Sequence, residues 1–178
     1  MQQTPEEILS RAVELCSPHQ VDVTLARMAG EIAARLSDSD PLVLCVMKGA
    51  VVFAGSLLPL LRFPLDFDYV HATRYRDQTQ GGALDWIVFP GDKVSGRHVL
   101  VLDDILDEGH TLAAIRERCL REGAVSFHSA VLLEKQIDRP KPITADFVGI
   151  CVPDRYVFGY GMDVNGRWRN LPGIYALR

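Results

Sequence analysis

An apolar run that ends in two aspartates, followed by a turn and a helical pattern, constrains the fold of this chain most strongly. Residues 99–102 are Val-Leu-Val-Leu, which is typical of a buried strand in a parallel sheet. Asp103 and Asp104 end this run, an acidic turn with one glycine follows, and residues 112–120 have helical spacing. A turn from strand to helix leaves backbone N–H groups that suit a phosphate. The two aspartates would repel a phosphate, so they need hydroxyl groups or a metal ion. The stretch therefore predicts a site for a phosphate beside a diol, as in a ribose 5-phosphate.

The remainder of the chain repeats this alternation of strand and helix. A short helix is expected to begin at Thr4, whose side chain can cap the first turn. Strands that alternate with helices predict an α/β fold, in which a mostly parallel, twisted sheet carries helices on both faces. The predicted strands cover residues 42–47, 65–75, 83–89, 125–133 and 146–152, and the predicted helices cover residues 21–36 and 51–61.

Composition and charge narrow the class of protein. A chain of 178 residues with 48% hydrophobic side chains is expected to fold as one globular domain, residues 1–178. Its formal net charge of −4 argues against a general nucleic-acid binder, and it shows neither a membrane-length apolar stretch nor a secretory signal. We therefore expect a cytoplasmic protein without a nucleic-acid or membrane partner. Its four cysteines are scattered without metal-ligand spacing and are expected to be reduced.

The stretch from Val99 to Leu112 resembles the phosphoribosyl-diphosphate-binding motif of the type I phosphoribosyltransferases, most closely that of their hypoxanthine-guanine subgroup. The resemblance implies that two acidic residues bind the ribose hydroxyls and that the following loop wraps the 5′-phosphate. It also implies that family's fold, with a flexible flap and a small hood beside the sheet. The subgroup often has Glu, Thr and Lys where this chain has Asp103, Glu108 and His110. The matching positions are the acidic pair, Asp103 and Asp104, and the phosphate loop, Asp107, Glu108, Gly109, His110 and Thr111.

A second segment, residues 153–163, resembles the family's purine-binding motif. The resemblance implies that the ring of Tyr156 stacks on the purine and that the backbone of Val157 reads the edge of the base. Asp163, together with the acidic pair, would hold Mg²⁺, a hard cation that prefers oxygen ligands. Taken alone, the aromatic side chains here are also typical of core packing, and a lone aspartate is typical of a turn.

Three shorter segments share features with the family. Lys48 and Gly49 follow an apolar strand, and in the family the backbone of such a segment meets the diphosphate after a peptide bond that is often cis. Arg169 matches the arginine that contacts diphosphate. Arg74 and Tyr75 precede a polar loop with two glycines and match the flap that closes over the site to exclude water. A plain strand-to-helix turn at the lysine and an ordinary hairpin at the flap are the alternatives.

Asp107 and Lys135 are the candidates for chemistry on the base. The resemblance places Asp107 where a carboxylate handles the proton on the purine N7, a task that suits a positioned carboxylate. Lys135, just after the predicted strand 125–133, matches the lysine that donates to the 6-oxo group and so selects oxopurines over adenine. The alternatives are an N-cap role for Asp107 and a solvated surface position for Lys135.

These expectations combine into a Mg²⁺-dependent transferase of purine salvage. It would move the 5-phosphoribosyl group from phosphoribosyl diphosphate to a 6-oxopurine, hypoxanthine or guanine, giving IMP or GMP and diphosphate. Members of the family are usually dimeric or tetrameric, so a homodimer or homotetramer is expected. Three alternatives stay open. They are a xanthine-preferring enzyme of this family, a regulatory protein of this fold that binds nucleotide and RNA, and a phosphorylated receiver domain.

Overall fold

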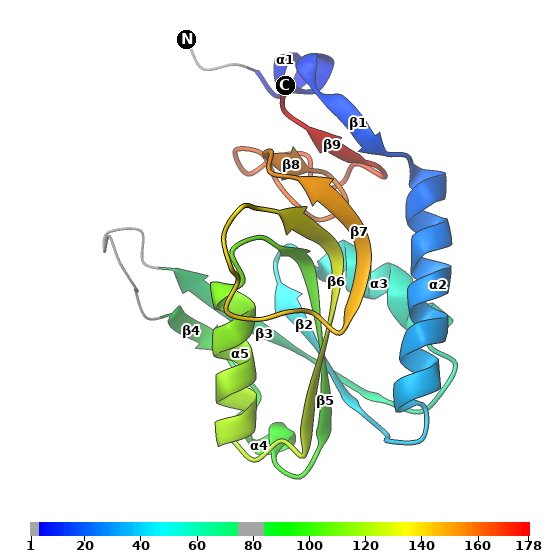
Figure 1. Ribbon diagram of the computed structural model, residues 1–178, viewed down its shortest axis with the longest axis vertical. Coiled ribbons are helices and arrows are strands. Elements are labelled where there is room, and N and C mark those ends of the chain that lie inside the picture. Colours follow the sequence, from blue (N-terminus) through cyan, green and yellow to red (C-terminus); the bar gives the residue numbers. More distant parts are fainter. Residues whose placement is uncertain (1–3, 75–83) are drawn as a thin grey trace.

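The computed structural model describes residues 4–74 and 84–178, and a six-stranded sheet runs through its centre (Figure 1). Neighbouring strands are parallel, except that β3 and β4 pair antiparallel at one edge. This confirms the mostly parallel sheet that the sequence predicts. In spatial order the strands are β4 (Leu84–Val88), β3 (Asp66–Arg74), β2 (Leu42–Met47), β5 (His98–Leu106), β6 (Ser126–Gln136) and β7 (Phe147–Pro153).

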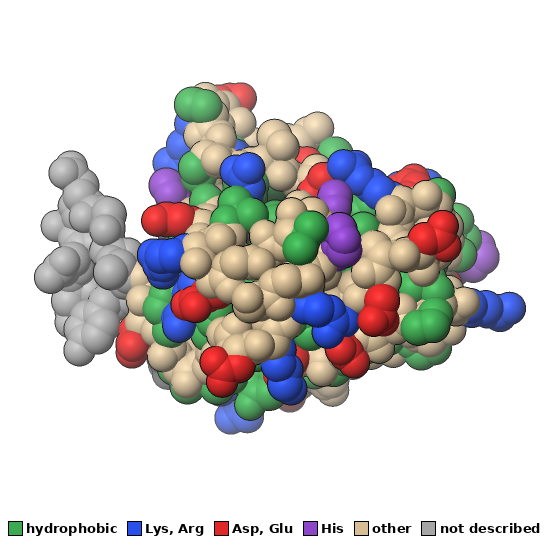
Figure 2. Space-filling model, turned by 90° about the horizontal axis from the view of Figure 1, so that it is seen from below, with side chains coloured by type: hydrophobic (Ala, Val, Ile, Leu, Met, Phe, Trp, Pro, Cys, Tyr) green, Lys and Arg blue, Asp and Glu red, His purple; other side chains and the backbone are tan. Residues whose placement is uncertain are grey.

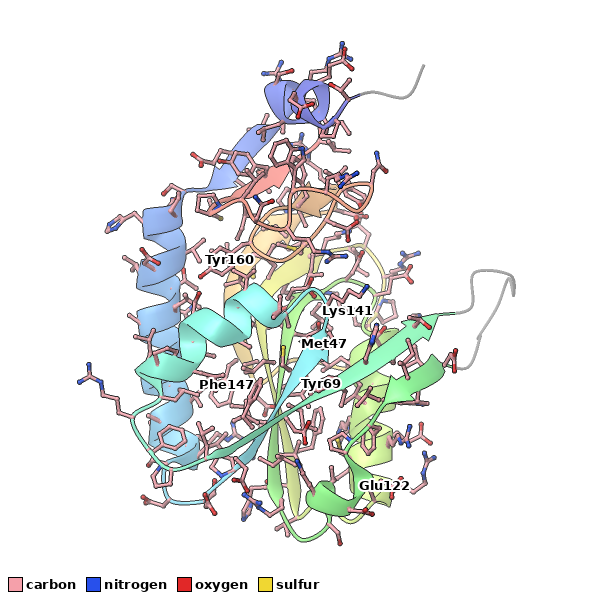
Figure 3. All side chains as sticks on the ribbon, turned by 180° about the vertical axis from the view of Figure 1, so that it is seen from behind. Met47, Tyr69, Glu122, Lys141, Phe147 and Tyr160 are labelled. Carbon is pink, nitrogen blue, oxygen red and sulfur yellow. The ribbon has the colours of Figure 1, made fainter. Side chains whose placement is uncertain are left out.

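Helices cover both faces of this sheet, as predicted. On one face lie α2 (Pro18–Leu36) and α3 (Val51–Leu57), and α3 continues into a 3₁₀ turn, η1 (Leu58–Leu60). On the opposite face lies α5 (His110–Arg121), as Figures 1 and 3 show together. Among the residues that the structure describes, no helix is both long and apolar enough to cross a lipid bilayer.

A second, smaller sheet forms the hood above the carboxyl ends of the central strands (Figure 1). It contains β1 (Val13–Cys16), β9 (Ile174–Ala176) and β8 (Val157–Phe158), with β9 in the middle and antiparallel to both neighbours. Beside it α1 (Pro5–Arg11) begins after Thr4, whose hydroxyl oxygen accepts from Glu7 N at 3.2 Å, as the sequence predicts. Segments from both ends of the chain therefore build the hood.

One apolar core joins the central sheet to the hood. β2 is buried on both of its faces, which explains its uninterrupted apolar sequence. The hood contributes inner residues to the same core, so the space between the two sheets has firm walls. Members of this core include Leu25, Met28 and Ile32 of α2, Leu42 and Leu44 of β2, Leu112 and Ile115 of α5, and Cys16, Val157 and Ile174 of the hood.

The strands β5 and β6 extend further than the sequence predicts. β5 does not end at Asp103, because the parallel ladder with β6 continues from the pair Asp103 and Val131 to the pair Leu106 and Glu134. β6 likewise extends past Lys135, which therefore lies within a strand and not after it. The prediction failed here because pairing with a neighbouring strand outweighs the polar character of the local sequence.

Two helices also differ from the predicted boundaries. α5 begins at His110, so His110 and Thr111 belong to its first turn and not to the preceding loop. Residues 91–94, for which the sequence predicted no helix, form the short helix α4 (Gly91–Val94). In both cases the residues are at the start of a helix. The sequence did not predict them as helical, because polar side chains in a first turn add nothing to the apolar spacing that marks a helix.

Candidate active site

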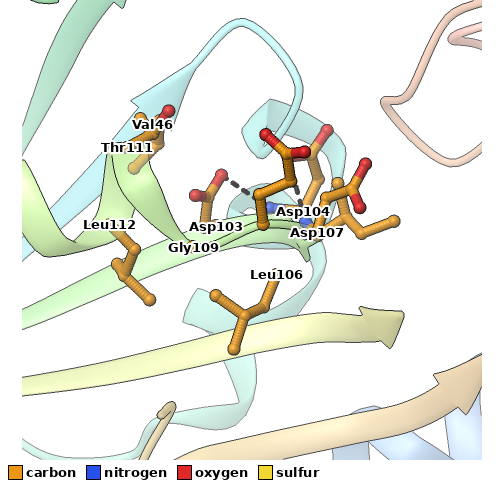
Figure 4. Close-up of a pocket in the computed structure, with 10 residues that line it drawn as sticks. Val46, Asp103, Asp104, Leu106, Asp107, Gly109, Thr111 and Leu112 are labelled. Atoms are coloured by element: carbon orange, nitrogen blue, oxygen red, sulfur yellow. Dashed lines mark hydrogen bonds between the residues drawn. The ribbon is translucent and has the colours of Figure 1, made fainter. Parts of the chain in front are cut away.

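A pocket opens where the carboxyl ends of β2 and β5 meet the first turn of α5 (Figure 4). Open parallel sheets bind ligands at this edge. The pocket has a volume of about 380 Å³ and contains the acidic pair and every predicted phosphate-loop residue except the exposed His110. Its lining residues are Val46, Asp103, Asp104, Ile105, Leu106, Asp107, Glu108, Gly109, Thr111 and Leu112.

Backbone N–H groups hold the acidic pair in place. Asp104 N donates to Asp103 Oδ1, and Ile105 N donates to Asp104 Oδ1, each at 3.0 Å (Figure 4). Burial, reinforced by repulsion from Asp104, raises the pKa of Asp103 well above its usual range. Burial also raises the pKa of Asp104. Two carboxylates in such surroundings favour a partner that donates hydrogen bonds or carries positive charge, as sugar hydroxyls and metal ions do.

Two glycines let three segments of backbone meet at the acidic pair. A side chain at Gly49 would begin 1.8 Å from Asp104 Oδ2, and one at Gly161 would begin 2.0 Å from the carbonyl oxygen of Gly49. Gly161 also has φ +102°, which side chains disfavour. The peptide bond between Met47 and Lys48 is cis, in keeping with the resemblance. The close approach accounts for Gly49, which the sequence singled out, and for Gly161, which it did not.

The phosphate loop ends at the amino terminus of α5. Gly109 has φ +84°, a left-handed conformation that favours glycine, and it precedes the first helical residue. Within the described residues, no side chain caps this helix and no acidic residue lies in its first turn. The first N–H groups of an α-helix have no partner inside the helix and carry partial positive charge. This end of α5 therefore suits an anion such as a phosphate.

Asp107 and Lys135 form an ion pair across the ends of β5 and β6. Lys135 Nζ lies 2.7 Å from Asp107 Oδ2 and 3.7 Å from Asp154 Oδ1. The lysine side chain is only 12% exposed, so it is not the solvated surface lysine of the alternative reading. Asp107 does not act as the N-cap of α5, because Gly109 occupies that position. A cation and a carboxylate thus lie together at the mouth of the site.

A second pocket, of about 210 Å³, extends from the acidic pair to the hood. Tyr156 is exposed here, and its hydroxyl donates to the backbone oxygen of Asp163 at 2.9 Å. Phe158 and Tyr160, by contrast, are buried and belong to the packing of the hood. The pocket gathers the three residues predicted to bind a purine. Its lining residues are Asp104, Ile105, Asp107, Lys135, Tyr156, Val157, Met162, Asp163 and Arg169.

Asp163 and Arg169 orient each other within this second pocket. Arg169 Nη2 forms an ion pair with Asp163 Oδ1, and Arg169 Nη1 donates to the carbonyl oxygen of Gly161 at 2.7 Å. The other carboxylate oxygen, Asp163 Oδ2, accepts from Gly166 N at 2.7 Å. Both side chains are therefore fixed before any ligand arrives.

The acidic residues fit a Mg²⁺ ion whose ligands come partly from the protein and partly from the substrate. Among residues 4–74 and 84–178, no cluster of three or more potential metal-binding side chains occurs. Mg²⁺ in phosphate-binding sites usually takes one or two carboxylates together with substrate phosphates and water. Asp104 and Asp163 border the same pocket and offer carboxylate oxygens, which is the donor set that such a cation requires.

Three predicted site residues remain, the diphosphate-binding Lys48 and the two flap residues. Lys48 is exposed at its turn and lines neither of them, although the adjacent Gly49 packs against Asp104. Arg74 is the last residue of β3, and Tyr75 lies outside the described residues. The predicted flap therefore stays a prediction.

The structure also adds residues that the sequence did not identify. Asp154 lies near Lys135, and Arg139 forms an ion pair with Glu108 of the phosphate loop. Lys141 contacts the ends of β5 and β6. The segment that contains Arg139 and Lys141 has two prolines and reads as a plain loop. The one available signal was a pair of cations close to the predicted strand end.

Known proteins that resemble this chain have the kind of activity that the two pockets suggest. Residues 19–165 match the phosphoribosyl transferase domain. The chain is 34% identical over 165 residues to the hypoxanthine-guanine phosphoribosyltransferase of Bacillus subtilis, and the match covers 92% of each protein. It is 31% identical over 165 residues to the hypoxanthine-guanine-xanthine phosphoribosyltransferase of Tritrichomonas foetus, covering 92% of this chain and 90% of that protein.

Solved structures agree. A hypoxanthine-guanine-xanthine phosphoribosyltransferase superposes with a TM-score of 0.78 at 30% identity, covering 93% of this chain and 94% of that one. A hypoxanthine-guanine phosphoribosyltransferase from Bacillus anthracis superposes with a TM-score of 0.83 at 29% identity, covering 93% of this chain and 98% of that one. The matched domain, the shared sequence and the shared fold together establish that the chain belongs to the phosphoribosyltransferase family.

Proposed function

We propose that this protein is a purine-salvage enzyme that transfers the 5-phosphoribosyl group from phosphoribosyl diphosphate to hypoxanthine and guanine. The products would be IMP or GMP and diphosphate. One observation carries the proposal: the acidic pair, the amino terminus of α5 and the Asp107–Lys135 ion pair border two pockets that share Asp104 and Asp107. A ribose phosphate and a base fit side by side in such a site.

The first pocket suits the donor. The carboxylates of Asp103 and Asp104 would accept hydrogen bonds from the two ribose hydroxyls, which relieves the desolvation that raises their pKa values. The 5′-phosphate would lie at the amino terminus of α5, among the backbone N–H groups of residues 109–112. Arg169 and the turn at Lys48 and Gly49 would face the diphosphate.

The second pocket suits a 6-oxopurine. Tyr156 is exposed and lines this pocket, where its ring would stack on the base, and the Val157 backbone would read the edge of the base. Lys135 Nζ would donate to the 6-oxo group, whereas the amino group of adenine offers it no equivalent acceptor. Asp107, freed from part of its contact with Lys135, would accept the proton that leaves N7 as the new bond to C1′ forms.

Asp163, with Asp103 and Asp104, would hold Mg²⁺ together with the donor. When bound, the cation would neutralise the charge that grows on the departing diphosphate. The contacts of Asp163 with Arg169 and Gly166 would keep its carboxylate oriented for this role.

A comparison of four bases tests the proposal. Purified protein is assayed with phosphoribosyl diphosphate, Mg²⁺ and, in turn, hypoxanthine, guanine, xanthine and adenine. We expect nucleotide formation with hypoxanthine and guanine and none with adenine. Turnover of adenine alone, or of none of the four bases, would contradict the proposal. A rate with xanthine that exceeds both others would favour the xanthine-preferring alternative instead.

A regulatory protein that binds RNA would need a basic face. The face in Figure 2, at the amino ends of the parallel strands, has acidic and basic side chains interspersed. Two ion pairs lie near the starts of β3 and β5, where Arg97 Nη1 is 2.6 Å from Asp66 Oδ2 and Lys93 Nζ is 2.6 Å from Asp68 Oδ2. This face therefore does not favour RNA, and the relatives named above, which are phosphoribosyltransferases, favour the catalytic alternative.

We also propose a cytoplasmic homodimer or homotetramer. All four cysteines are free thiols, which suits a reducing compartment. Phe67 and Tyr69 of β3 are exposed on one side of the strand, which suits burial against another copy of the chain. Light scattering after size-exclusion chromatography would test this, and a monomer at micromolar concentration would contradict it.

A further inference from the structure

Lys141 is a largely buried cation that the proposed reaction does not use. It lies in the loop between β6 and β7, and Figure 3 shows it at the same end of the central sheet as Met47. Its side chain is 11% exposed. The ammonium donates to Lys135 O at 2.7 Å, Leu106 O at 3.1 Å and Glu134 Oε1 at 3.2 Å. An ammonium group has three N–H donors, so these contacts use all of them.

The two carbonyl groups belong to backbone that positions Asp107 and Lys135. Leu106 directly precedes Asp107, and Lys135 supplies the ammonium that lies 2.7 Å from Asp107 Oδ2. The ladder between β5 and β6 ends at the pair Leu106 and Glu134. Beyond that pair, the spacing of the two chains depends on other contacts, and Lys141 bonds to both of them.

Neighbours of Lys141 pack against the phosphate loop. A side chain at Gly109 would begin 3.3 Å from Ile143 Cγ2 and 3.4 Å from Pro142 Cδ. Arg139 forms an ion pair with Glu108. The segment from Arg139 to Ile143 therefore lies against the turn between β5 and α5, and Lys141 joins this segment to the strand ends.

We propose that Lys141 is a positioning residue: by bonding to the carbonyls of Leu106 and Lys135, it sets the spacing between Asp107 and Lys135 that the transfer reaction requires. The inference rests on the proposed function. Lys141 lines neither the pocket of the acidic pair nor the base pocket, so it acts through the backbone and touches neither substrate. A misplacement of about 1 Å in a reacting group can lower a rate about 10²-fold.

Lys141→Met tests the inference because it keeps an unbranched side chain and removes the ammonium. With hypoxanthine as substrate we expect kcat to fall about 10- to 100-fold. The KM of phosphoribosyl diphosphate should stay within about threefold, since the acidic pair and the α5 terminus are unchanged. The preference for hypoxanthine over adenine should also fall, because it depends on where Lys135 lies. Lys141→Arg, which can still donate to both carbonyls, should recover much of kcat.

Lys93→Met is the matched control, since it removes another lysine from a short ion pair, with Asp68, at the far end of the sheet. It should keep the wild-type kcat and base preference. Each variant is assayed at a temperature well below its own thermal unfolding midpoint. The rates are divided by the number of active sites, which is measured as the amount of donor bound per chain. If Lys141→Met does not fold, Lys141→Gln replaces it, with a smaller loss of kcat expected.

Two results would overturn the inference. One is a folded Lys141→Met protein with wild-type kcat and base preference. The other is a crystal structure of that variant in which the distance from Asp107 to Lys135 is unchanged, whatever its activity. Wild-type turnover is measured first, because its absence would contradict the proposed function, whereas the crystal structure judges the role of Lys141 separately.

Discussion

At the scale of single residues, the carboxylate of Asp103 is expected to help bind the donor but to destabilise the folded protein when no ligand is bound. Its buried carboxylate lies beside that of Asp104, and burial raises its pKa. A raised carboxyl pKa means that the folded chain disfavours the charged form. Folding therefore loses stability as the pH rises above the unfolded value of about 3.9. A ligand with hydroxyl groups or positive charge would restore that free energy.

Asp103→Asn should stabilise the free protein and weaken donor binding. The amide oxygen still accepts from Asp104 N, while the buried charge is gone. We expect the free energy of unfolding at pH 7 to rise by about 1 kcal/mol or more. Asp68→Asn is the opposite control. Lys93 donates to Asp68 and lowers its pKa, so loss of the Asp68 carboxylate should destabilise the folded protein. Urea unfolding and donor-binding calorimetry measure both effects. An Asp103→Asn protein less stable than the wild type would show this account to be wrong.

Asp107→Asn should separate catalysis from binding. The change keeps the shape of the side chain but removes the group that accepts the N7 proton, so kcat with hypoxanthine should fall by about 10²–10⁴-fold. The dissociation constant of phosphoribosyl diphosphate should change little, because the acidic pair and the α5 terminus remain. Steady-state rates and calorimetry give the two quantities. Undiminished turnover would rule out proton transfer by this residue.

At the scale of elements, the junction of β5 and α5 depends on Gly109. An alanine there would hold φ near +84° and begin 3.3 Å from Ile143 Cγ2. We expect a stability loss of about 1–2 kcal/mol from the left-handed backbone. The KM of phosphoribosyl diphosphate should also rise several-fold, because the first turn of α5 shifts.

Gly96→Ala is the matched control for Gly109→Ala. Gly96 also has a left-handed φ, +74°, but its added methyl would meet nothing within 4 Å. It should lose similar stability and keep the wild-type KM. Equal KM values for the two variants would mean that the junction at Gly109 does not position the phosphate loop.

The sequence predicts the elements of the central sheet better than the hood. β2 and the first half of β5 are buried on both faces, so apolar runs mark them directly. The hood strands are two to four residues long and join Val13 to Ala176, and such distant pairing leaves no local pattern. Their existence as a hood came only from the family resemblance.

The same limit applies to the site. Asp107 and Lys135 belong to motifs, and the sequence places them on neighbouring strand ends. Their direct contact, and the contacts of Lys141 with two carbonyl groups, depend on the register of β5 and β6 and on a loop path that no periodicity encodes. Gly161 is required by the carbonyl of Gly49, more than a hundred residues earlier in the sequence, and only the folded chain reveals this.

At the scale of the whole molecule, pairs such as Lys93 and Asp68 make stability depend on pH. The hydrogen bond from Lys93 lowers the pKa of Asp68. A lowered pKa stabilises the fold fully above the unfolded value of about 3.9, and this contribution is lost as the pH falls through the folded pKa.

Lys93→Met should therefore melt at a lower temperature than the wild type at pH 7, and this difference should shrink as the pH falls through the folded pKa of Asp68. Thermal unfolding followed by circular dichroism at several pH values measures this. Because one core joins sheet and hood, we also expect a single transition, in keeping with one domain over residues 1–178. A difference that persists in strong acid would assign the role of Lys93 to packing instead.

The position of β9 has a consequence for how the molecule is made. β1 hydrogen-bonds only to β9 among the described strands, so an early segment must wait for residues 174–176 to emerge from the ribosome. Until then the nascent chain can form the central sheet and its helices, but it cannot complete the small sheet that covers the base pocket. Prematurely terminated chains should thus keep much of their architecture and yet be unable to process a purine.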